Sequence, residues 1–200
     1  MFSKYDVYTD VQSIYCYKDT DVLINKLNIH DKDVLKNAET EFVAVKQLIL
    51  LKNPLNGHFT MTHLLNIHKF LFEDIYPFAG KLRKEQISKG DTAFYPPNYI
   101  KRELKRVFSA IHSNNFLTET DDVLRLRNLS WVMSELNIIH PFREGNGRSI
   151  REFVRCMALK YGYHLNWGNT DRDTLINAAI ASVYDSMAFY DVLKQCLVEV

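Results

Sequence analysis

The sequence predicts an all-α domain that carries one small β-hairpin. Apolar residues recur at three- and four-residue intervals along most of the 200 residues, as they do on helices that pack on one side. Residues 84–95 break this pattern and have turn-forming residues at their centre, which indicates a hairpin. The chain is 46% hydrophobic and has a length typical of one domain, so it has enough apolar side chains for a packed core.

The first 18 residues are expected to form an extended arm that lies on a single domain spanning residues 19–200. They contain four tyrosines but no helical period: Tyr5, Tyr8, Tyr15 and Tyr17. Packing of these aromatic rings over the core is the favoured interpretation.

Three helices are expected before the hairpin, at residues 19–28, 31–51 and 60–75. The first has Asp19, Thr20 and Asp21 as candidate N-caps, and the third has Thr60. The second has an apolar face made of Val34, Leu35, Ala38, Phe42, Val45, Leu48 and Ile49. His63 and His68 on the third helix are five residues apart, which is not the spacing of a helical metal pair, so we interpret them as structural.

Five helices are expected after the hairpin. Their predicted ranges are 98–112, 121–140, 146–160, 171–181 and 186–198, with a loop at 162–169. The second of them begins at Asp121 or Asp122 and ends at His140, and the third begins near Asn146. Residues 140–145 would therefore form a short loop between two long helices.

Charge argues against nucleic acid as a direct partner, because the net charge is only +1. One basic cluster exists, and its helical spacing favours a solvated face: Lys101, Arg102, Lys105 and Arg106.

The cysteines and the apolar runs indicate a cytoplasmic protein without a membrane partner. The three cysteines, Cys16, Cys156 and Cys196, show no metal spacing and no disulfide pattern, which favours a reducing compartment. No signal segment and no run long enough to span a bilayer occurs in the sequence. Secretion of the folded protein into a host is the alternative.

The stretch HPFREGNGRSIR at residues 140–151 contains the residue types that hold a nucleoside triphosphate and accept a proton. His140 can accept a proton near neutral pH. Glu144 is a hard oxygen ligand that suits Mg²⁺.

The second half of this stretch is suited to phosphate. Gly145, Asn146 and Gly147 form a turn whose backbone N–H groups could cradle an anion, next to the N-terminus of the following helix. Arg148 and Arg151 lie three residues apart on that helix and supply guanidinium forks for phosphate oxygens. Each feature alone has a simpler interpretation as a turn, a structural histidine or a solvated arginine pair, but their combination favours a nucleotide site.

This stretch resembles the signature of the Fic (filamentation induced by cAMP) family, H-P-F-x-[D/E]-G-N-G-R-x-x-R, at every specified position. Residues 76–83 and 87–94 resemble the family's segment that leads into a β-hairpin called the flap. Phe78 stands there where Trp is frequent in the family. The resemblance covers roughly residues 20–190 and implies a Fic-type helical bundle with the flap at about 84–95.

The resemblance implies a stand-alone protein adenylyltransferase, which moves AMP from MgATP to a Tyr, Thr or Ser hydroxyl of a target protein and releases diphosphate. His140 would be the base, and Glu144 would hold Mg²⁺. The phosphates would bind Gly145, Asn146, Gly147, Arg148 and Arg151. Kinase-like relatives carry Lys in place of Gly147, so AMP transfer is favoured over phosphate transfer. The target would dock on the flap, through Lys89, Gly90, Asp91 and Thr92 and through a hydrophobic clamp, Phe94.

The resemblance also bears on regulation and on partners. Many relatives carry a helix with the pattern [S/T]-x-x-x-E-[G/N], which this sequence lacks. A separate antitoxin subunit that supplies a Glu to Arg151 is the favoured expectation, and a trimmed chain or an unrestrained enzyme is the alternative. By family analogy the target would be an ATPase subunit of a type II topoisomerase. Separately from the resemblance, exposed tyrosines of the arm are the alternative to core packing, as acceptors for self-modification. A catalytically silent interaction module, a phosphotransferase and a nucleotide hydrolase are the competing functions.

Overall fold

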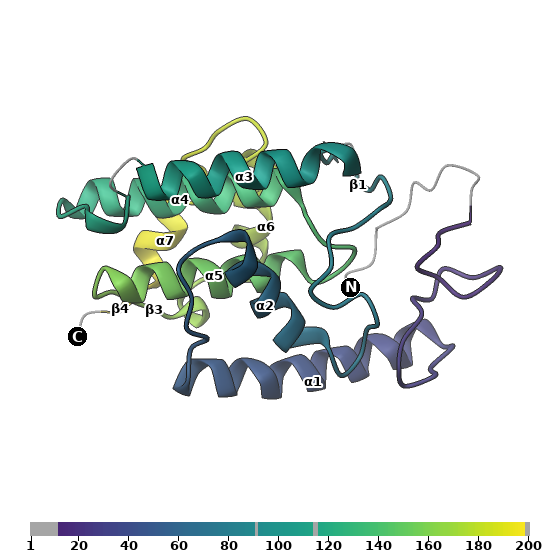
Figure 1. Cartoon of the computed structure of the whole chain (residues 1–200). Coiled ribbons are helices and arrows are strands. Elements are labelled where there is room, and N and C mark those ends of the chain that lie inside the picture. The colour runs from purple at the N-terminus through teal and green to yellow at the C-terminus, as the bar shows by residue number, and fades with distance from the viewer. Residues whose placement is uncertain (1–11, 91, 114–115, 199–200) are drawn as a thin grey trace.

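A computed structural model describes residues 12–90, 92–113 and 116–198 (Figure 1). Seven α-helices and two short antiparallel strand pairs make up its regular structure. The all-α class and the flap hairpin are therefore confirmed. None of the helices in the described ranges combines the length and hydropathy that a membrane span requires.

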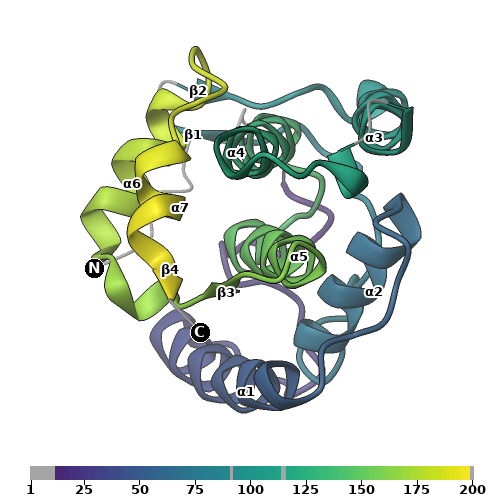
Figure 2. The same cartoon turned by 90° about the vertical axis from the view of Figure 1, so that its left-hand side faces the viewer.

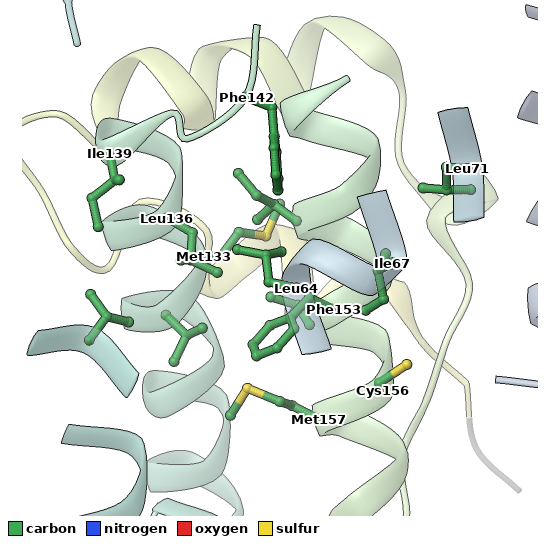
Figure 3. Packing of buried hydrophobic residues seen from close by; sticks show 14 of the residues in the cluster. Leu64, Ile67, Leu71, Met133, Leu136, Ile139, Phe142, Phe153, Cys156 and Met157 are labelled. Atoms are coloured by element: carbon green, nitrogen blue, oxygen red, sulfur yellow. The ribbon is translucent and has the colours of Figure 1, made fainter. Parts of the chain in front are cut away.

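Helix α5 (Asn146–Lys160) lies near the centre of the bundle, with the other long helices arranged around it (Figure 2). It packs most extensively against α4 (Asp122–Ile139) and α2 (Met61–Phe72). Their shared core includes the fully buried Phe142 and Phe153 (Figure 3). Burial of a large apolar side chain is worth about 2–3 kcal/mol, so this core holds α4 and α5 together on both sides of the loop that joins them.

Side-chain caps define where these helices begin, as the sequence predicts. The Asp121 carboxylate accepts a hydrogen bond from the Leu124 N–H at the start of α4, and the Thr60 hydroxyl accepts one from the His63 N–H at the start of α2. Helix α2 ends at Phe72, three residues before the predicted end. Helix α3 (Pro97–Ser113) and the 3₁₀ turn Phe116–Thr118 complete this half of the bundle.

Helix α1 (Lys32–Lys52) is where predicted, but its predicted apolar face is wrong. The buried residues are Leu35, Glu39, Val43 and Leu50. Most of the predicted face is exposed: Val34, Phe42, Val45, Leu48 and Ile49 are 41–60% exposed. The buried stripe has helical spacing but contains a charged residue, Glu39, which a search for apolar residues passes over.

Residues 19–28 form turns and not the predicted helix. Asp19 has a left-handed backbone, with φ of 58°. The Asn25 side-chain amide donates to the carbonyls of Leu23 and Ile29, and its oxygen accepts from the Ile29 N–H. Asn and Asp side chains compete for backbone groups in this way, so the local turn wins over a helix.

The predicted hairpin consists of β1 (Ser88–Lys89) and β2 (Thr92–Ala93), in antiparallel register with Ser88 opposite Ala93. The described part of the arm, residues 12–18, lies against the chain that leads into β1. There the Ser13 hydroxyl and the Ile14 N–H both donate to the Glu85 carboxylate. Tyr5, Tyr8 and Asp91 lie outside the described residues.

The C-terminal region differs in part from the prediction. Helix α6 (Arg172–Ala181) is confirmed, whereas α7 (Tyr190–Cys196) is shorter than the predicted 186–198. The chain leaves α7 to form β4 (Leu197–Val198), which pairs with β3 (His164–Leu165) in the predicted loop; the 3₁₀ turn Trp167–Asn169 follows β3. Two-residue strands carry too little periodicity to be recognised in a sequence.

Candidate active site

The predicted residues of the 140–151 stretch lie where α4 meets α5: residues 140–145 form the loop between the two helices, and Asn146, Gly147, Arg148 and Arg151 lie in the first turns of α5. His140 ends α4 with a left-handed backbone, at φ 48°, which turns the chain out of the helix. Gly145 precedes α5 with φ 77°. A Cβ atom on Gly145 would stand 2.2 Å from the Phe72 ring, so only glycine fits there.

Replacing Gly145 by alanine is therefore expected to lower the free energy of unfolding by about 2–4 kcal/mol, since left-handed strain adds to a clash in the core. Gly162→Ala is the matched control. Gly162 also has a positive φ, of 85°, but has open space where its Cβ would lie. Urea titration measures both variants, and equal losses would show that the contact with Phe72 does not constrain the loop.

The imidazole of His140 is held as a neutral base. Its Nδ1 lies 3.0 Å from the Asn137 carbonyl oxygen, which can only accept, so Nδ1 carries the proton. Nε2 then has a lone pair, and within the described residues it has no hydrogen-bond partner although it is buried. Burial lowers the pKa of His140 to about 3, and the positive charges of Arg83 and Lys89 act in the same direction.

Phe94 packs on this base. The two rings stack with centroids 3.7 Å apart and an interplanar angle of 14°, and Phe94 is 5% exposed. The prediction that Phe94 clamps the target therefore needs correction, because its ring is buried against His140. At the flap itself, Lys89 and Gly90 are exposed and Thr92 is partly buried.

Arg83 also belongs to the site, and sequence analysis did not identify it. It is 2% exposed, and it donates to the carbonyl oxygens of His140 at 2.8 Å, Glu85 at 2.6 Å and Tyr95 at 2.5 Å. It thereby joins the base of the flap to the end of α4. A buried arginine that bonds only to backbone oxygens has no sequence pattern of its own.

Two side chains keep the loop rigid. The Asn146 amide accepts from the Phe142 N–H and donates to the Phe142 carbonyl, both at 2.8 Å. His68 accepts from the Gly80 N–H at Nδ1, so its Nε2 donates to the Glu144 carbonyl at 2.9 Å. Asn146 therefore braces the loop with its side chain, and only its backbone N–H is available to the predicted phosphate cradle. His68 has a structural role, as predicted.

The predicted phosphate cradle corresponds to the first turn of α5. The first backbone bond into this helix runs from the Ser149 N–H to the Gly145 carbonyl, so the N–H groups of Asn146, Gly147 and Arg148 have no partner within the helix. A Cβ on Gly147 would lie 3.3 Å from Nη1 of Arg151. The absence of a side chain there keeps the helix N-terminus open beside Arg151, which is the geometry of an anion site.

Arg148 and Arg151 differ in their ion pairing. Arg148 is ion-paired, with its Nη2 2.5 Å from Glu39 and 3.5 Å from Glu144. Arg151 is partly buried and makes no hydrogen bond or ion pair with the described residues. Burial and the charge of Arg148 lower the pKa of Arg151 to about 10. A partly buried cation without a counter-ion is costly, so its position favours an anionic ligand.

Glu144 is the acidic residue of the loop. Its Oε1 accepts from the Gly145 N–H at 2.8 Å, whereas Oε2 accepts from no described residue. Burial, followed by repulsion from Glu39, raises the pKa of this carboxyl. No three His, Cys, Asp or Glu side chains gather into a metal site in the described ranges. A single free carboxylate oxygen next to a phosphate cradle fits Mg²⁺, which protein sites commonly hold through one carboxylate and the phosphates themselves.

A neutral buried histidine, an open helix N-terminus and a carboxylate lie together at the junction of α4 and α5, which is the arrangement expected of a nucleotide-dependent transfer site. The family model described as Fic/DOC family matches residues 58–158. The chain belongs to this family. "Probable protein adenylyltransferase y4lH" of Sinorhizobium fredii is 31% identical over 182 residues, which cover 90% of this chain and 93% of that protein. "Probable protein adenylyltransferase Fic" of Escherichia coli is 30% identical over 168 residues, covering 84% and 83%.

A longer relative and two solved structures extend the comparison. "Protein adenylyltransferase VbhT" of Bartonella schoenbuchensis is 34% identical over 90% of this chain, which spans only 36% of that protein. The BepC protein of Bartonella tribocorum, solved with bound AMPPNP, has a TM-score of 0.83 at 25% identity and covers 93% of this chain and 97% of that one. The N-terminal Fic domain of a Bartonella sp. AR 15-3 effector has a TM-score of 0.86 at 21% identity, covering 97% and 95%. The helical fold is thus the Fic fold.

Proposed function

We propose that this protein transfers AMP from MgATP to a hydroxyl group of a target protein. The proposal rests on the unprotonated Nε2 of His140, which ends α4 just before the open N-terminus of α5, and on Arg151, a cation of α5 that pairs with no described residue. The names of the relatives, which are protein adenylyltransferases, support the same reaction.

In this reaction the target's hydroxyl oxygen attacks the α-phosphorus of ATP while its proton passes to Nε2 of His140. The bond between the α-phosphorus and the bridging oxygen breaks, and diphosphate leaves. Arg151 and the N–H groups of the first turn of α5 lie where the charge of the leaving group can be stabilised. Glu144 would hold Mg²⁺, which neutralises phosphate charge. The Nδ1–H of His140, bonded to the Asn137 carbonyl, keeps the ring oriented as the imidazolium forms.

Gly147 supports AMP transfer over phosphate transfer. A longer side chain at this position would contact Nη1 of Arg151 and fill the mouth of the cradle. With the cradle open, the β- and γ-phosphates can occupy it and leave the α-phosphate beside His140. All of the residues that the transfer needs are present, which also argues against a silent interaction module.

Mass spectrometry of modified peptides tests the proposal. The protein is incubated with MgATP in a bacterial lysate, and the modified peptides are sequenced. AMP on Tyr, Thr or Ser residues is the expected result. Phosphate on the same residues would instead assign a phosphotransferase, and release of AMP without modified peptides would assign a hydrolase.

The pH profile of this reaction is expected to lack the usual histidine inflection. The pKa of His140 is lowered from 6.5 to about 3, so the base form is already dominant well below neutral pH. Because kcat/KM reports on the free enzyme, its value should stay flat from about pH 5.5 to pH 8. Initial rates across this range measure it. A tenfold fall in kcat/KM between about pH 7 and pH 5.5, centred near 6.5, would contradict the burial of His140 as described.

Two partner proposals accompany the reaction. The exposed edge of the flap supports docking of an extended target segment by β-augmentation. Arg151 pairs with no residue in the described part of the chain, which supports a separate antitoxin subunit that supplies an acidic side chain to it. Such a subunit should weaken the binding of AMPPNP to the wild-type protein. If it weakened the binding of AMPPNP to Arg151→Gln by the same factor, the contact with Arg151 would be ruled out.

A further inference from the structure

Glu39 connects the longest helix to the candidate site. It lies on α1, outside residues 140–151 and outside the segment that the family model matches. It is 9% exposed and occupies the middle of the inward stripe of α1. A carboxylate in such a stripe costs free energy unless it is paired, so its partners indicate why the position is charged.

Both oxygens of Glu39 have partners, and one of these partners is the site residue Arg148. Oε1 is 2.5 Å from Nη2 of Arg148, and Oε2 accepts a hydrogen bond from the Tyr76 hydroxyl. Burial and the negative charge of Glu39 raise the pKa of Tyr76, so this hydroxyl keeps its proton and donates. The Arg148 guanidinium also lies over the Phe72 ring, 4.8 Å from its centroid. Arg148 is thus held along one edge and across one face.

The other edge of Arg148 remains available. A guanidinium has five N–H donors in a fixed fork, and Nη2 is the only nitrogen of Arg148 that bonds to a described residue. Nε and Nη1 keep their donors. The contact between Nη2 and Glu39 therefore fixes the direction in which the Nε and Nη1 donors point, next to the first turn of α5.

We infer that Glu39 is a positioning residue that aligns Arg148 for the phosphates of the nucleotide. This inference rests on the nucleotide site of the proposed function, and it assigns to α1 a role that the loop motif does not contain. The two oxygens of Glu39 bond to Arg148 and Tyr76, so its effect on nucleotide binding would pass through Arg148. If Glu39 instead competed with phosphate for Arg148, its replacement would lower the Kd for AMPPNP.

Calorimetric titration of the full chain with AMPPNP and Mg²⁺ separates these roles. Glu39→Gln keeps the shape of the side chain and removes its charge, and the Kd for AMPPNP should rise roughly tenfold, as expected for loss of a charge-assisted hydrogen bond. Glu41→Gln is the matched control, because Glu41 is an exposed acid on the same helix. It should leave the Kd unchanged within about twofold. An unchanged or lower Kd in Glu39→Gln would overturn the inference.

Two further variants keep the test decisive if Glu39→Gln folds poorly. Tyr76→Phe removes only the hydroxyl that holds Oε2, and it should raise the Kd for AMPPNP about threefold. Arg148→Gln should make the Kd insensitive to Tyr76→Phe, because the positioned group is gone. Equal effects of Tyr76→Phe in the presence and absence of Arg148 would contradict positioning. Binding does not depend on transfer, so a chain that binds AMPPNP in this pattern but modifies no protein would overturn the proposed function alone.

Discussion

Replacing His140 by alanine is expected to lower kcat for AMP transfer by about a thousandfold, within the range measured for general bases. The variant lacks the buried Nε2 that receives the proton of the attacking hydroxyl. It retains the first turn of α5, Arg148 and Arg151, so the Kd for AMPPNP should change by no more than a few-fold. Steady-state transfer rates and calorimetry measure the two effects separately.

His164→Ala is the control for this experiment. His164 is exposed on β3, far along the chain from the loop, and its replacement should leave both quantities unchanged. Loss of the stack between His140 and Phe94 lowers stability in His140→Ala, so both variants are compared well below their Tm. Transfer by His140→Ala at more than about a tenth of the wild-type rate would remove His140 from the role of base.

Replacing Arg151 by glutamine is expected to separate function from stability. The variant loses a cation that no described residue pairs, so its free energy of unfolding should be unchanged or higher than that of the wild type. The Kd for AMPPNP should rise at least tenfold, because the charge that would meet the phosphates is lost. Urea titration and calorimetry with AMPPNP give the two values.

Arg155→Gln provides the matched contrast one helical turn further along α5. Arg155 is 5% exposed and is bound by both oxygens of Glu152, each at 2.8 Å. Breaking this buried pair should lower the free energy of unfolding by about 3–5 kcal/mol, while the Kd for AMPPNP of the folded fraction stays unchanged. If Arg151→Gln were the more destabilised of the two, Arg151 would have a structural partner and its assignment to phosphate would fail.

The loop residues could be predicted from the sequence because they are contiguous. Twelve consecutive positions carry the base, the carboxylate, the turn and both arginines, and the helical periodicity on either side places them at the junction of two helices. The contacts that reach the loop from elsewhere in the chain could not be predicted. Arg83 and Phe94 reach His140 from the flap segment, and Glu39 reaches Arg148 from α1. Such contacts depend on tertiary packing, which periodicity does not encode.

The incorrect prediction of the buried face of α1 has the same cause. Apolar patterning selects the side of the helix that contains Phe42 and Leu48, and this side is exposed. The buried side contains Glu39, which is stable there only because Arg148 and Tyr76 come to it from two other parts of the chain. Glu39 is therefore a charged residue on the buried face, where apolar patterning does not expect one. The missing helix at 19–28 has a local cause, since the Asn25 side chain takes the backbone groups that a helix needs.

The position of the transferred phosphorus tests the central claim most directly. The wild-type chain and His140→Ala are incubated in a lysate with MgATP labelled at the α-phosphorus and, separately, at the γ-phosphorus. The account predicts protein-bound label from the α position only, and none with His140→Ala. Protein-bound label from the γ position would contradict it, since the open cradle at Gly147 would then hold ATP in the reverse orientation and the protein would transfer phosphate.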